Sequence, residues 1–172
     1  MLSNESIVEH VNKNREEYLA LLKNLVVIED RAEDNVQNII ANKFRELKCE
    51  VDKIVKNPLS LRLEKEFASE SSIRMTDRVS IVGTNRGTGG GKNLLFFAHP
   101  DNEPIRSTED WIHGPFSGEM ENGKMYGWGI ADDLVGVAIM TGALETVQKM
   151  GVELRGDVIL CSTASKQNAR GI

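Results

Sequence analysis

Apolar residues recur at helical spacing in the first third of the chain. This spacing predicts two helices, one over residues 6–28 and one over residues 33–48. Ser6 and Glu9 form a capping-box pattern at the start of the first helix. The apolar faces comprise Ile7, Val11, Tyr18, Leu22 and Leu25 in the first helix and Val36, Ile39, Ile40, Phe44 and Leu47 in the second. Each predicted helix therefore has one face to bury against another element.

Shorter apolar segments have the length and pattern of strands. The four predicted strands are residues 50–55, 78–82, 94–98 and 157–161, and the third of these is apolar throughout and expected to be buried. Residues 56–77 are polar and predict a loop that contains at most one short helical turn. A further helix is predicted over residues 132–150, ending at Gly151 as is typical of a helix C-cap. Strands that alternate with helices in this order predict an α/β fold, a three-layer sandwich around a mixed, partly parallel sheet.

Two glycine-containing segments predict turns. Residues 121–124 read Glu-Asn-Gly-Lys, which is typical of a tight hairpin turn between two short strands. Residues 87–93 precede the strand 94–98 and also favour a hairpin turn. The alternative is a phosphate-binding loop, which needs a glycine and a Ser or Thr at the positions that Arg86 and Asn93 occupy here.

Composition narrows the class of protein. At 172 residues the chain fits one domain, and its net charge of −5 at pH 7 argues against a nucleic-acid partner. Cys49 and Cys161 lie far apart and form no zinc-binding pattern, which suits a reducing compartment. The first residues lack the pattern of a signal peptide, and no apolar run approaches the roughly 18 residues needed to cross a bilayer. We therefore expect a cytoplasmic protein with no membrane partner.

Polar residues that suit a metal site follow the predicted strand 94–98. His99 and Asp101 come directly after it, where α/β proteins commonly build their sites. A neutral imidazole is the commonest zinc ligand, and the carboxylate of Asp101 would accept the other ring N–H of His99. Asp132 follows a second, glycine-rich loop, and its carboxylate would bridge two metal ions. This order of residues favours a metal-dependent hydrolase.

Each of these residues also has a purely structural interpretation. A lone His-x-Asp is usually a surface pair or part of a turn. Asp132 is a natural N-cap for a helix over residues 133–150, and Asp133 would then occupy the first helical position, which the helix dipole favours. The functional interpretation rests on the joint order and spacing of the three residues.

Residues from about 20 to 172 resemble the N-terminal half of the catalytic domain of a zinc metallopeptidase family. That family includes acetylornithine deacetylase, succinyl-diaminopimelate desuccinylase, aminoacylase-1, carnosinase-type dipeptidases and glutamate carboxypeptidase. Residues 94–101 are similar to its first metal motif, and residues 111–132 are similar to its long second motif over nearly every step. One departure is Trp128, where the family usually has arginine.

The resemblance implies a role for each candidate residue. His99 would bind one metal ion, Asp101 would orient His99 and tune the acidity of the attacking water, and Asp132 would bridge two zinc ions. Cobalt or manganese could replace zinc. In the family the metal ions activate a water that hydrolyses an amide bond, and a glutamate takes its proton. The implied substrate is an N-acyl amino acid or a short peptide.

Two larger departures concern completeness. The family has a Glu-Glu pair after the strand that matches 157–161, and its first Glu is the general base; here Lys166 and Gln167 take those positions. The family also continues for about as many residues again, with further ligands and a lid and dimerisation domain. We therefore expect residues 1–172 to form a partial catalytic domain of a truncated amidohydrolase, inactive alone. An uncovered sheet edge would favour a homodimer or other self-association.

Two alternatives remain open at this point. The chain could be a pseudoenzyme or binding module that keeps the fold without the catalytic glutamate. Another residue could also serve as the base, but the spacing of Glu103, Asp133 and Glu119 favours none of them.

Overall fold

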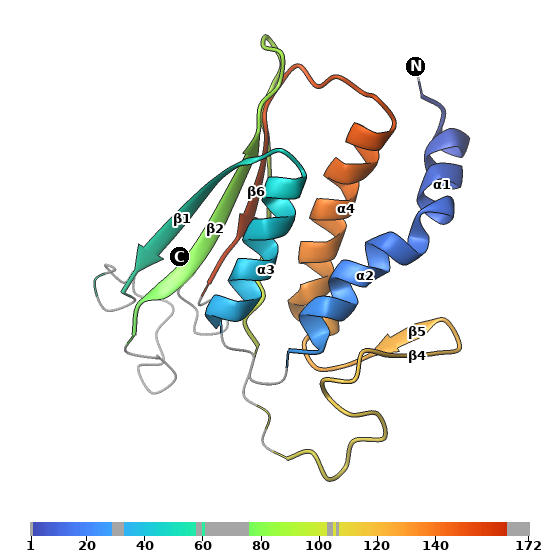
Figure 1. Ribbon diagram of the computed structural model, residues 1–172, viewed down its shortest axis with the longest axis vertical. Coiled ribbons are helices and arrows are strands. Elements are labelled where there is room, and N and C mark those ends of the chain that lie inside the picture. Colours follow the sequence, from blue (N-terminus) through green and yellow to red (C-terminus); the bar gives the residue numbers. More distant parts are fainter. Residues whose placement is uncertain are drawn as a thin grey trace, which may run out of the picture.

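The computed structural model of the chain describes residues 2–28, 33–57, 60, 76–102, 105 and 107–164. In chain order the elements are α1 (Asn4–Lys13), α2 (Arg15–Val26), α3 (Glu33–Glu46), β1 (Glu50–Lys56), β2 (Arg78–Asn85), β3 (Leu94–Ala98), β4 (Glu119–Glu121), β5 (Lys124–Tyr126), the short helical turn η3 (Ile130–Leu134), α4 (Val135–Lys149) and β6 (Val158–Ser162). Helices pack along one main sheet, and β4 and β5 form a separate hairpin below α2 (Figure 1).

The main sheet has four strands in the order β1-β2-β6-β3. β2 pairs antiparallel with both β1 and β6, whereas β3 runs parallel to β6 with Phe96 opposite Leu160. The predicted α/β fold with a mixed, partly parallel sheet is therefore confirmed. Because β3 and β6 are parallel, their carboxyl ends lie at the same end of the sheet, and that end carries the candidate site.

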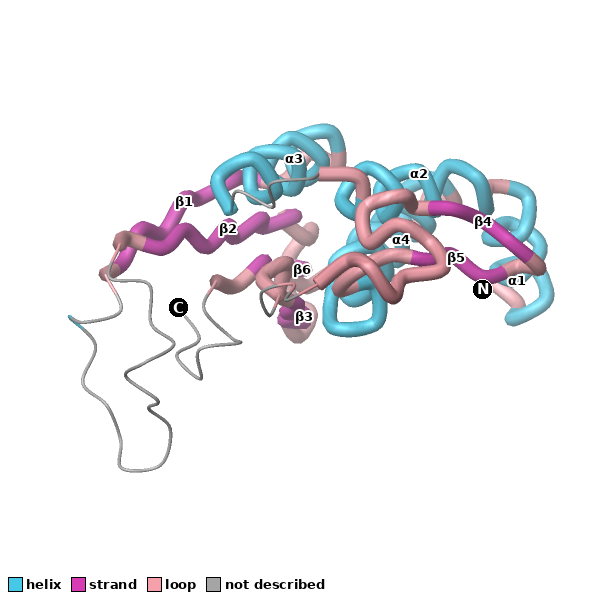
Figure 2. Tube along the Cα trace, turned by 90° about the horizontal axis from the view of Figure 1, so that it is seen from below, coloured by secondary structure: helices cyan, strands magenta, loops and turns pink. Residues whose placement is uncertain are grey.

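Helices α3 and α4 pack along one face of the sheet, and α2 packs on α4 farther from the strands (Figures 1 and 2). Gly83 of β2 lets α3 approach closely, because a Cβ at this position would lie 2.6 Å from the Phe44 ring. The largest fully buried apolar side chains are Phe44, Leu25, Ile40, Leu134 and Leu160. Among the described elements no helix lies on the opposite face of the sheet. The described residues therefore form two layers of the predicted three-layer sandwich.

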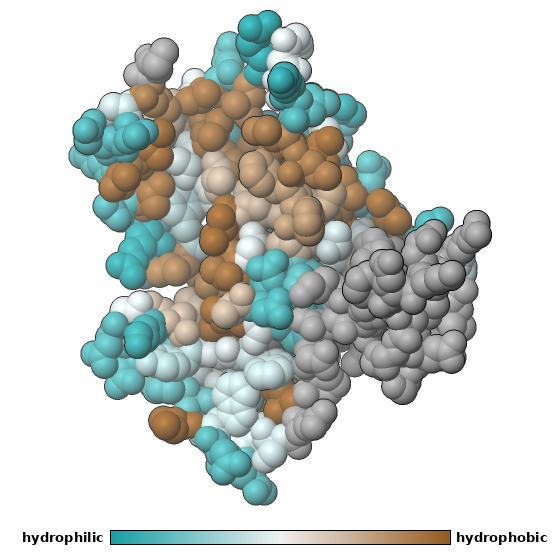
Figure 3. All heavy atoms as spheres, turned by 180° about the vertical axis from the view of Figure 1, so that it is seen from behind, coloured by the Kyte–Doolittle hydropathy of each residue, from teal (hydrophilic) through white to brown (hydrophobic). Residues whose placement is uncertain are grey.

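Strand β3 lies at the edge of the sheet, and its apolar side chains are exposed. The expectation of a buried strand is wrong for these four residues, whose exposed fractions are Leu94 55%, Leu95 61%, Phe96 43% and Phe97 74%. β6 is the only neighbour of β3 in the described sheet, so apolar side chains reach solvent on both faces. Hydrophobic side chains gather over the sheet in the view from behind (Figure 3). β3 is therefore an edge strand with exposed apolar side chains, and such an edge favours pairing with another strand.

The predicted single helix over residues 6–28 is two helices that meet at Asn14. The Asn14 side chain donates to the carbonyl of His10 at 2.8 Å, and its backbone N–H donates to the same oxygen at 3.1 Å. An asparagine that bonds its neighbouring backbone in this way offers an alternative to a continuous helix. The capping prediction is also wrong, because the Ser3 hydroxyl, not Ser6, accepts the N-terminal hydrogen bond.

The remaining helix and strand predictions agree with the structure apart from their ends. The predicted helix 33–48 is α3, and the strands 50–55, 78–82 and 157–161 correspond to β1, β2 and β6. The loop predicted over residues 56–77 falls largely outside the described residues. None of the helices in the described ranges is both long and apolar enough to span a membrane.

The two turn predictions have different outcomes. The hairpin turn at residues 121–124 is confirmed, with Asn122 and Gly123 at positive φ between β4 and β5. The hairpin predicted at residues 87–93 is wrong, because β6 lies between β2 and β3. The backbone N–H groups of Thr88 and Gly89 donate to the carbonyls of residues 154 and 155. These two donors are therefore used within the protein and are not available to a phosphate.

Candidate metal centre

The structure brings His99 and Asp132 together from two separate loops. His99 follows β3 at the carboxyl end of the sheet and is buried, with 6% of its surface exposed. Its Nε2 lies 3.0 Å from Oδ1 of Asp132, whose side chain is 65% exposed. A buried imidazole thus faces a carboxylate that is open to solvent. The two residues that the sequence singled out as metal ligands are therefore neighbours.

The other ring nitrogen of His99 is held by the backbone of Asp101. Nδ1 lies 3.1 Å from the carbonyl oxygen of Asp101 and 3.6 Å from the nearest carboxylate oxygen of the same residue. A carbonyl oxygen can only accept, so we assign the ring hydrogen to Nδ1. The orienting contact therefore comes from the backbone of Asp101, whereas the sequence suggested its carboxylate.

Asp132 lies in η3, before the start of α4. Its φ of −142° and ψ of 88° are not helical, Asp133 is also non-helical, and the peptide bond between them is cis. The structural interpretation of Asp132 as an N-cap and Asp133 as the first helical residue is therefore wrong, because α4 begins only at Val135. The helix predicted over residues 132–150 is correspondingly shorter at its start.

Glycines let the second loop approach its neighbours. A Cβ at Gly127 would lie 2.4 Å from Cγ1 of Val26 in α2. A Cβ at Gly129, whose φ is +72°, would lie 1.8 Å from Oδ1 of Asn102. The loop that carries Asp132 therefore rests on α2 on one side and on the loop after His99 on the other.

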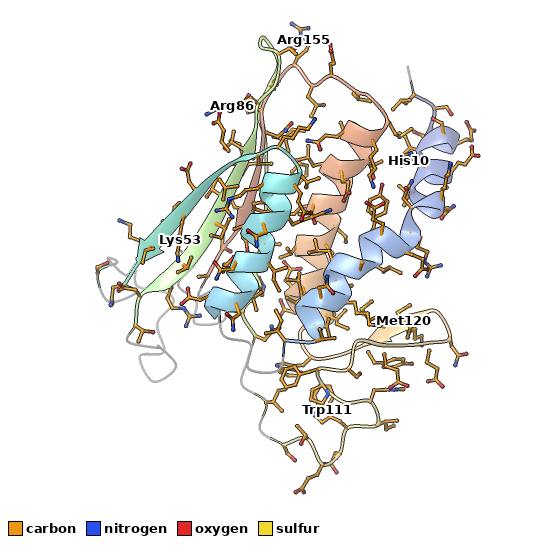
Figure 4. All side chains as sticks on the ribbon, viewed as in Figure 1. His10, Lys53, Arg86, Trp111, Met120 and Arg155 are labelled. Atoms are coloured by element: carbon orange, nitrogen blue, oxygen red, sulfur yellow. The ribbon has the colours of Figure 1, made fainter. Side chains whose placement is uncertain are left out.

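An aromatic pair forms within the long segment between His99 and Asp132. The rings of Trp111 and Trp128 pack edge to face with their centroids 5.6 Å apart. The indole Nε1 of Trp111 donates to the carbonyl of Ser107. The backbone N–H of Trp128 donates to the carbonyl of Pro115 at 2.7 Å. Trp111 lies at the opposite end of the molecule from Arg155 (Figure 4). An indole contact therefore occupies the position where the resembled family usually has a charged arginine.

A second histidine cluster went unrecognised in the sequence. His113 Nδ1 lies 2.9 Å from Oε2 of Glu119 and its Nε2 lies 3.6 Å from Oε2 of Glu121, two residues that alternate along β4. The His113 ring also stacks on Tyr126 at 3.8 Å between centroids. Only the hairpin pattern hinted at this arrangement, since it places residues 119 and 121 on one face of a strand.

The residues considered as alternative bases lie in different surroundings. Glu119 contacts His113, as described above. A Cβ on Gly136 would lie 2.4 Å from the carboxylate of Asp133, which therefore sits against the first turn of α4. Glu103 falls outside the described residues, as do Lys166 and Gln167.

Neither cysteine is set up as a reactive thiolate. Burial raises the pKa of the Cys49 thiol to about 11 and also raises the pKa of Cys161. A raised pKa leaves little thiolate near neutral pH, and the thiolate is the form that attacks substrates or binds metals. The chemistry of this region therefore falls to the imidazole and the carboxylates.

The donor atoms at His99 and Asp132 fit a zinc ion. With its hydrogen on Nδ1, a neutral His99 ring points a lone pair at a carboxylate oxygen 3.0 Å away, an arrangement that a cation between them stabilises. Nitrogen and oxygen ligands bound to one tetrahedral zinc ion stand roughly 3.4 Å apart. Within the described ranges, no group of three or more His, Cys, Asp or Glu side chains is arranged to hold a metal ion. The fit to a zinc ion therefore rests on two side chains, those of His99 and Asp132.

Comparisons with known proteins point to one family. Residues 95–165, which include both candidate loops, match the model of peptidase family M20/M25/M40. The chain is 25% identical over 169 residues to the N-formyl-4-amino-5-aminomethyl-2-methylpyrimidine deformylase of Bacillus subtilis, covering 94% of this chain and 35% of the relative. It is 47% identical over 53 residues to the succinyl-diaminopimelate desuccinylase of Methylorubrum extorquens, covering 31% of this chain and 14% of the relative.

The fold is also similar to a solved structure. Human carnosine dipeptidase 1 superposes with a TM-score of 0.71 at 16% sequence identity, over 92% of this chain and 34% of that one. The chain thus spans about a third of the length of the first proteins that it matches. The resemblance predicted from the sequence is confirmed: the segment 95–165, which contains His99, Asp101 and Asp132, matches the model of peptidase family M20/M25/M40.

Proposed function

We propose that this chain supplies part of the metal centre of an amide hydrolase. The observation that carries the proposal is the 3.0 Å approach of His99 Nε2 to Asp132 Oδ1, made by two loops that both lie in the matched segment. The names of the relatives describe removal of a formyl or succinyl group and cleavage of a dipeptide. An N-acyl amino acid or a short peptide is therefore the proposed substrate class.

Each residue has a proposed task. His99 and Asp132 would hold zinc, with Asp132 shared between two ions, and cobalt or manganese could take the same donors. The carbonyl of Asp101 fixes the His99 ring so that Nε2 points outward, and the Asp101 carboxylate lies close enough to influence the charge at the ring. When bound, the ions would supply Lewis acidity that activates water and polarises an amide carbonyl.

We further propose that the chain of 172 residues is inactive alone and works as part of a larger, zinc-dependent amidohydrolase. Two side chains are fewer than the three or four protein ligands that zinc normally takes. By the resemblance, Lys166 and Gln167 stand where the family has a catalytic base and a ligand. A lysine cannot act as a carboxylate base, and its positive charge opposes a nearby cation.

A binding module is the second candidate function. It is favoured by the sequence after β6, since residues 163–172 contain no acidic side chain. In that case the fold would present a ligand site beside His99 and lack the base for hydrolysis. The two candidate functions differ in one outcome. If the missing carboxylate base is supplied, by a second chain or by substitution in this one, turnover should return for a partial hydrolase and should not return for a binding module.

Two further proposals concern the state of the protein. The exposed apolar edge at β3 supports self-association, including a homodimer, through strand pairing. The two free cysteines support a reducing compartment such as the cytoplasm.

The test is a zinc titration of the purified chain, combined with an amidase assay. We expect His99→Ala and Asp132→Ala each to weaken zinc binding at least tenfold, whereas His10→Ala in α1 leaves it unchanged. Equal zinc binding by all four proteins would contradict the proposed centre. We expect no turnover of N-acyl amino acids or dipeptides, and turnover that His99→Ala abolishes would overturn the proposed inactivity.

A further inference from the structure

The amide of Asn102 forms the surface on which the Asp132 loop rests. Asn102 directly follows Asp101, and Gly129 precedes Asp132 by three residues. A Cβ added to Gly129 would lie 1.8 Å from Oδ1, 2.3 Å from Cγ and 2.6 Å from Nδ2 of Asn102. The whole amide group therefore faces the Cα of Gly129 with no room for a side chain between them.

Asn102 is itself held in place. Its Nδ2 donates to the carbonyl of Pro100 at 2.9 Å, which fixes the amide plane relative to the loop that carries His99. Its Oδ1 is buried, and no hydrogen-bond donor meets it in the part of the chain that the structure describes. The contact with Gly129 is therefore steric, and it is made by a buried acceptor that has no hydrogen-bond partner among the described residues.

Gly129 in turn sets the start of η3. It adopts a left-handed conformation, with φ 72° and ψ 9°, which glycine reaches without steric cost. Its carbonyl accepts a hydrogen bond from the Leu134 N–H at 3.1 Å, which closes the turn around Asp132. A displacement of Gly129 would therefore carry Asp132 with it.

We propose that Asn102 is a positioning residue that sets the separation of His99 and Asp132. It is anchored to the His99 loop through Pro100 and limits how closely the Asp132 loop approaches through Gly129. The inference rests on the proposed function only in treating these two residues as metal ligands. The size of the side chain at position 102 then controls metal affinity without touching the metal.

A double-mutant cycle on Asn102 and Gly129 tests this coupling. Gly129→Ala forces a methyl group into the Asn102 amide, and we expect it to lower zinc affinity at least tenfold. In the Asn102→Ala background the space is open, so adding Gly129→Ala should lower affinity no more than about twofold, a departure from additivity that marks direct contact. Equal losses in both backgrounds would overturn the proposal.

Gly151→Ala is the matched control for backbone strain. Gly151 has a φ of +68°, nearly that of Gly129, but a Cβ there meets nothing within 4 Å. We expect Gly151→Ala to lower folding stability and to leave zinc affinity within twofold of the parent. A loss of zinc affinity equal to that of Gly129→Ala would mean that strain alone accounts for the effect. Asn102→Gln, one methylene longer, is a second probe that should weaken zinc binding while the glycine is retained.

A readout without metal separates this inference from the proposed function. The ¹⁵N resonances of the His99 ring report its contact with Asp132, and Asp132→Ala provides the reference for a broken contact. We expect Gly129→Ala to move the Nε2 resonance toward that reference and the double variant to move it back at least halfway. If the parent chain binds no zinc, the metal centre fails while this cycle still decides the role of Asn102. Identical Nε2 resonances in the parent and in Gly129→Ala would overturn it.

Discussion

Gly83 of β2 lies directly against the ring of Phe44 in α3, so close that a Cβ would stand 2.6 Å from Cδ2. Phe44 is fully buried. The contact fixes how α3 sits on the sheet, and the sheet in turn carries the loops of the candidate centre.

Removing either side of this contact should destabilise the fold. Phe44→Ala leaves a cavity and should cost about 3–5 kcal/mol, whereas Gly83→Ala overpacks the contact and should cost about 1–3 kcal/mol. The double variant should cost less than the sum, because the new methyl group enters the space that the ring vacates. Urea unfolding measures all three values, and strict additivity would mean that the two residues do not share this space.

The apolar edge at β3 should drive self-association. Phe97→Lys places a charge on the most exposed apolar side chain of the strand and should shift the protein toward the monomer in sedimentation experiments. Ile112→Lys is the matched control, since Ile112 is 94% exposed but lies in a loop outside the strands. A similar distribution of oligomers in the parent chain and in Phe97→Lys would contradict an associating edge.

Acid should remove a contribution of Asp157 at the other end of the sheet. The Gly87 N–H hydrogen bond, together with the guanidinium of Arg86, lowers the pKa of Asp157 below its ordinary value near 3.8. The stabilisation is therefore complete above that ordinary pKa and is lost as the pH falls through the lowered one. Asp157→Asn should be less stable than the parent near neutral pH, and the difference should shrink in acid.

The hydrogen bond from Gly87 is the larger cause of this pKa shift. Arg86→Gln should consequently reduce the acid dependence without abolishing it, as measured by the free energy of unfolding against pH. The free energies of unfolding of the parent and of Asp157→Asn could differ by the same amount across the acid range. That result would contradict a contribution from the ionised carboxylate of Asp157.

Glu145 of α4 pairs with Lys43 of α3 and with Lys149 of its own helix, and Lys149 also pairs with Glu17 of α2. The carboxylate of Glu145 lies 2.9 Å from Nζ of Lys43 and 3.2 Å from Nζ of Lys149, and only 9% of its side chain is exposed. Glu145→Gln leaves two partly buried ammonium groups with a weaker partner and should cost about 1–3 kcal/mol. Glu46→Gln is the control, because Glu46 pairs with Lys43 at 3.8 Å and is 69% exposed. Equal losses would mean that burial of Glu145 adds nothing.

The sequence predicted best where a single rule decides the outcome. Periodicity alone locates α3, since its apolar stripe has one face to bury, and Asn-Gly alone locates the turn between β4 and β5. It failed where the outcome depends on distant residues. Nothing near residues 87–93 reveals that β6 inserts between β2 and β3, and the apolar run 94–98 is the same for a central strand as for an edge strand.

The candidate metal centre was also predicted only in part. The motif residues His99 and Asp132 were recognisable because residues 94–101 and 111–132 resemble the metal motifs of the family whose model matches residues 95–165. The helix start was misplaced, since an aspartate before an apolar run is typical of an N-cap and local sequence does not reveal the non-helical turn at η3. The contact of Asn102 with Gly129 joins residues from two loops, and no local pattern announces it.

We propose that His99 and Asp132 hold the same metal ion. Anomalous diffraction at the zinc absorption edge, from crystals of this chain grown with zinc, tests it most directly. We expect a peak within bonding distance of both His99 Nε2 and a carboxylate oxygen of Asp132, and no peak there in His99→Ala crystals. Zinc found at His113 or elsewhere, with none between His99 and Asp132, would contradict it.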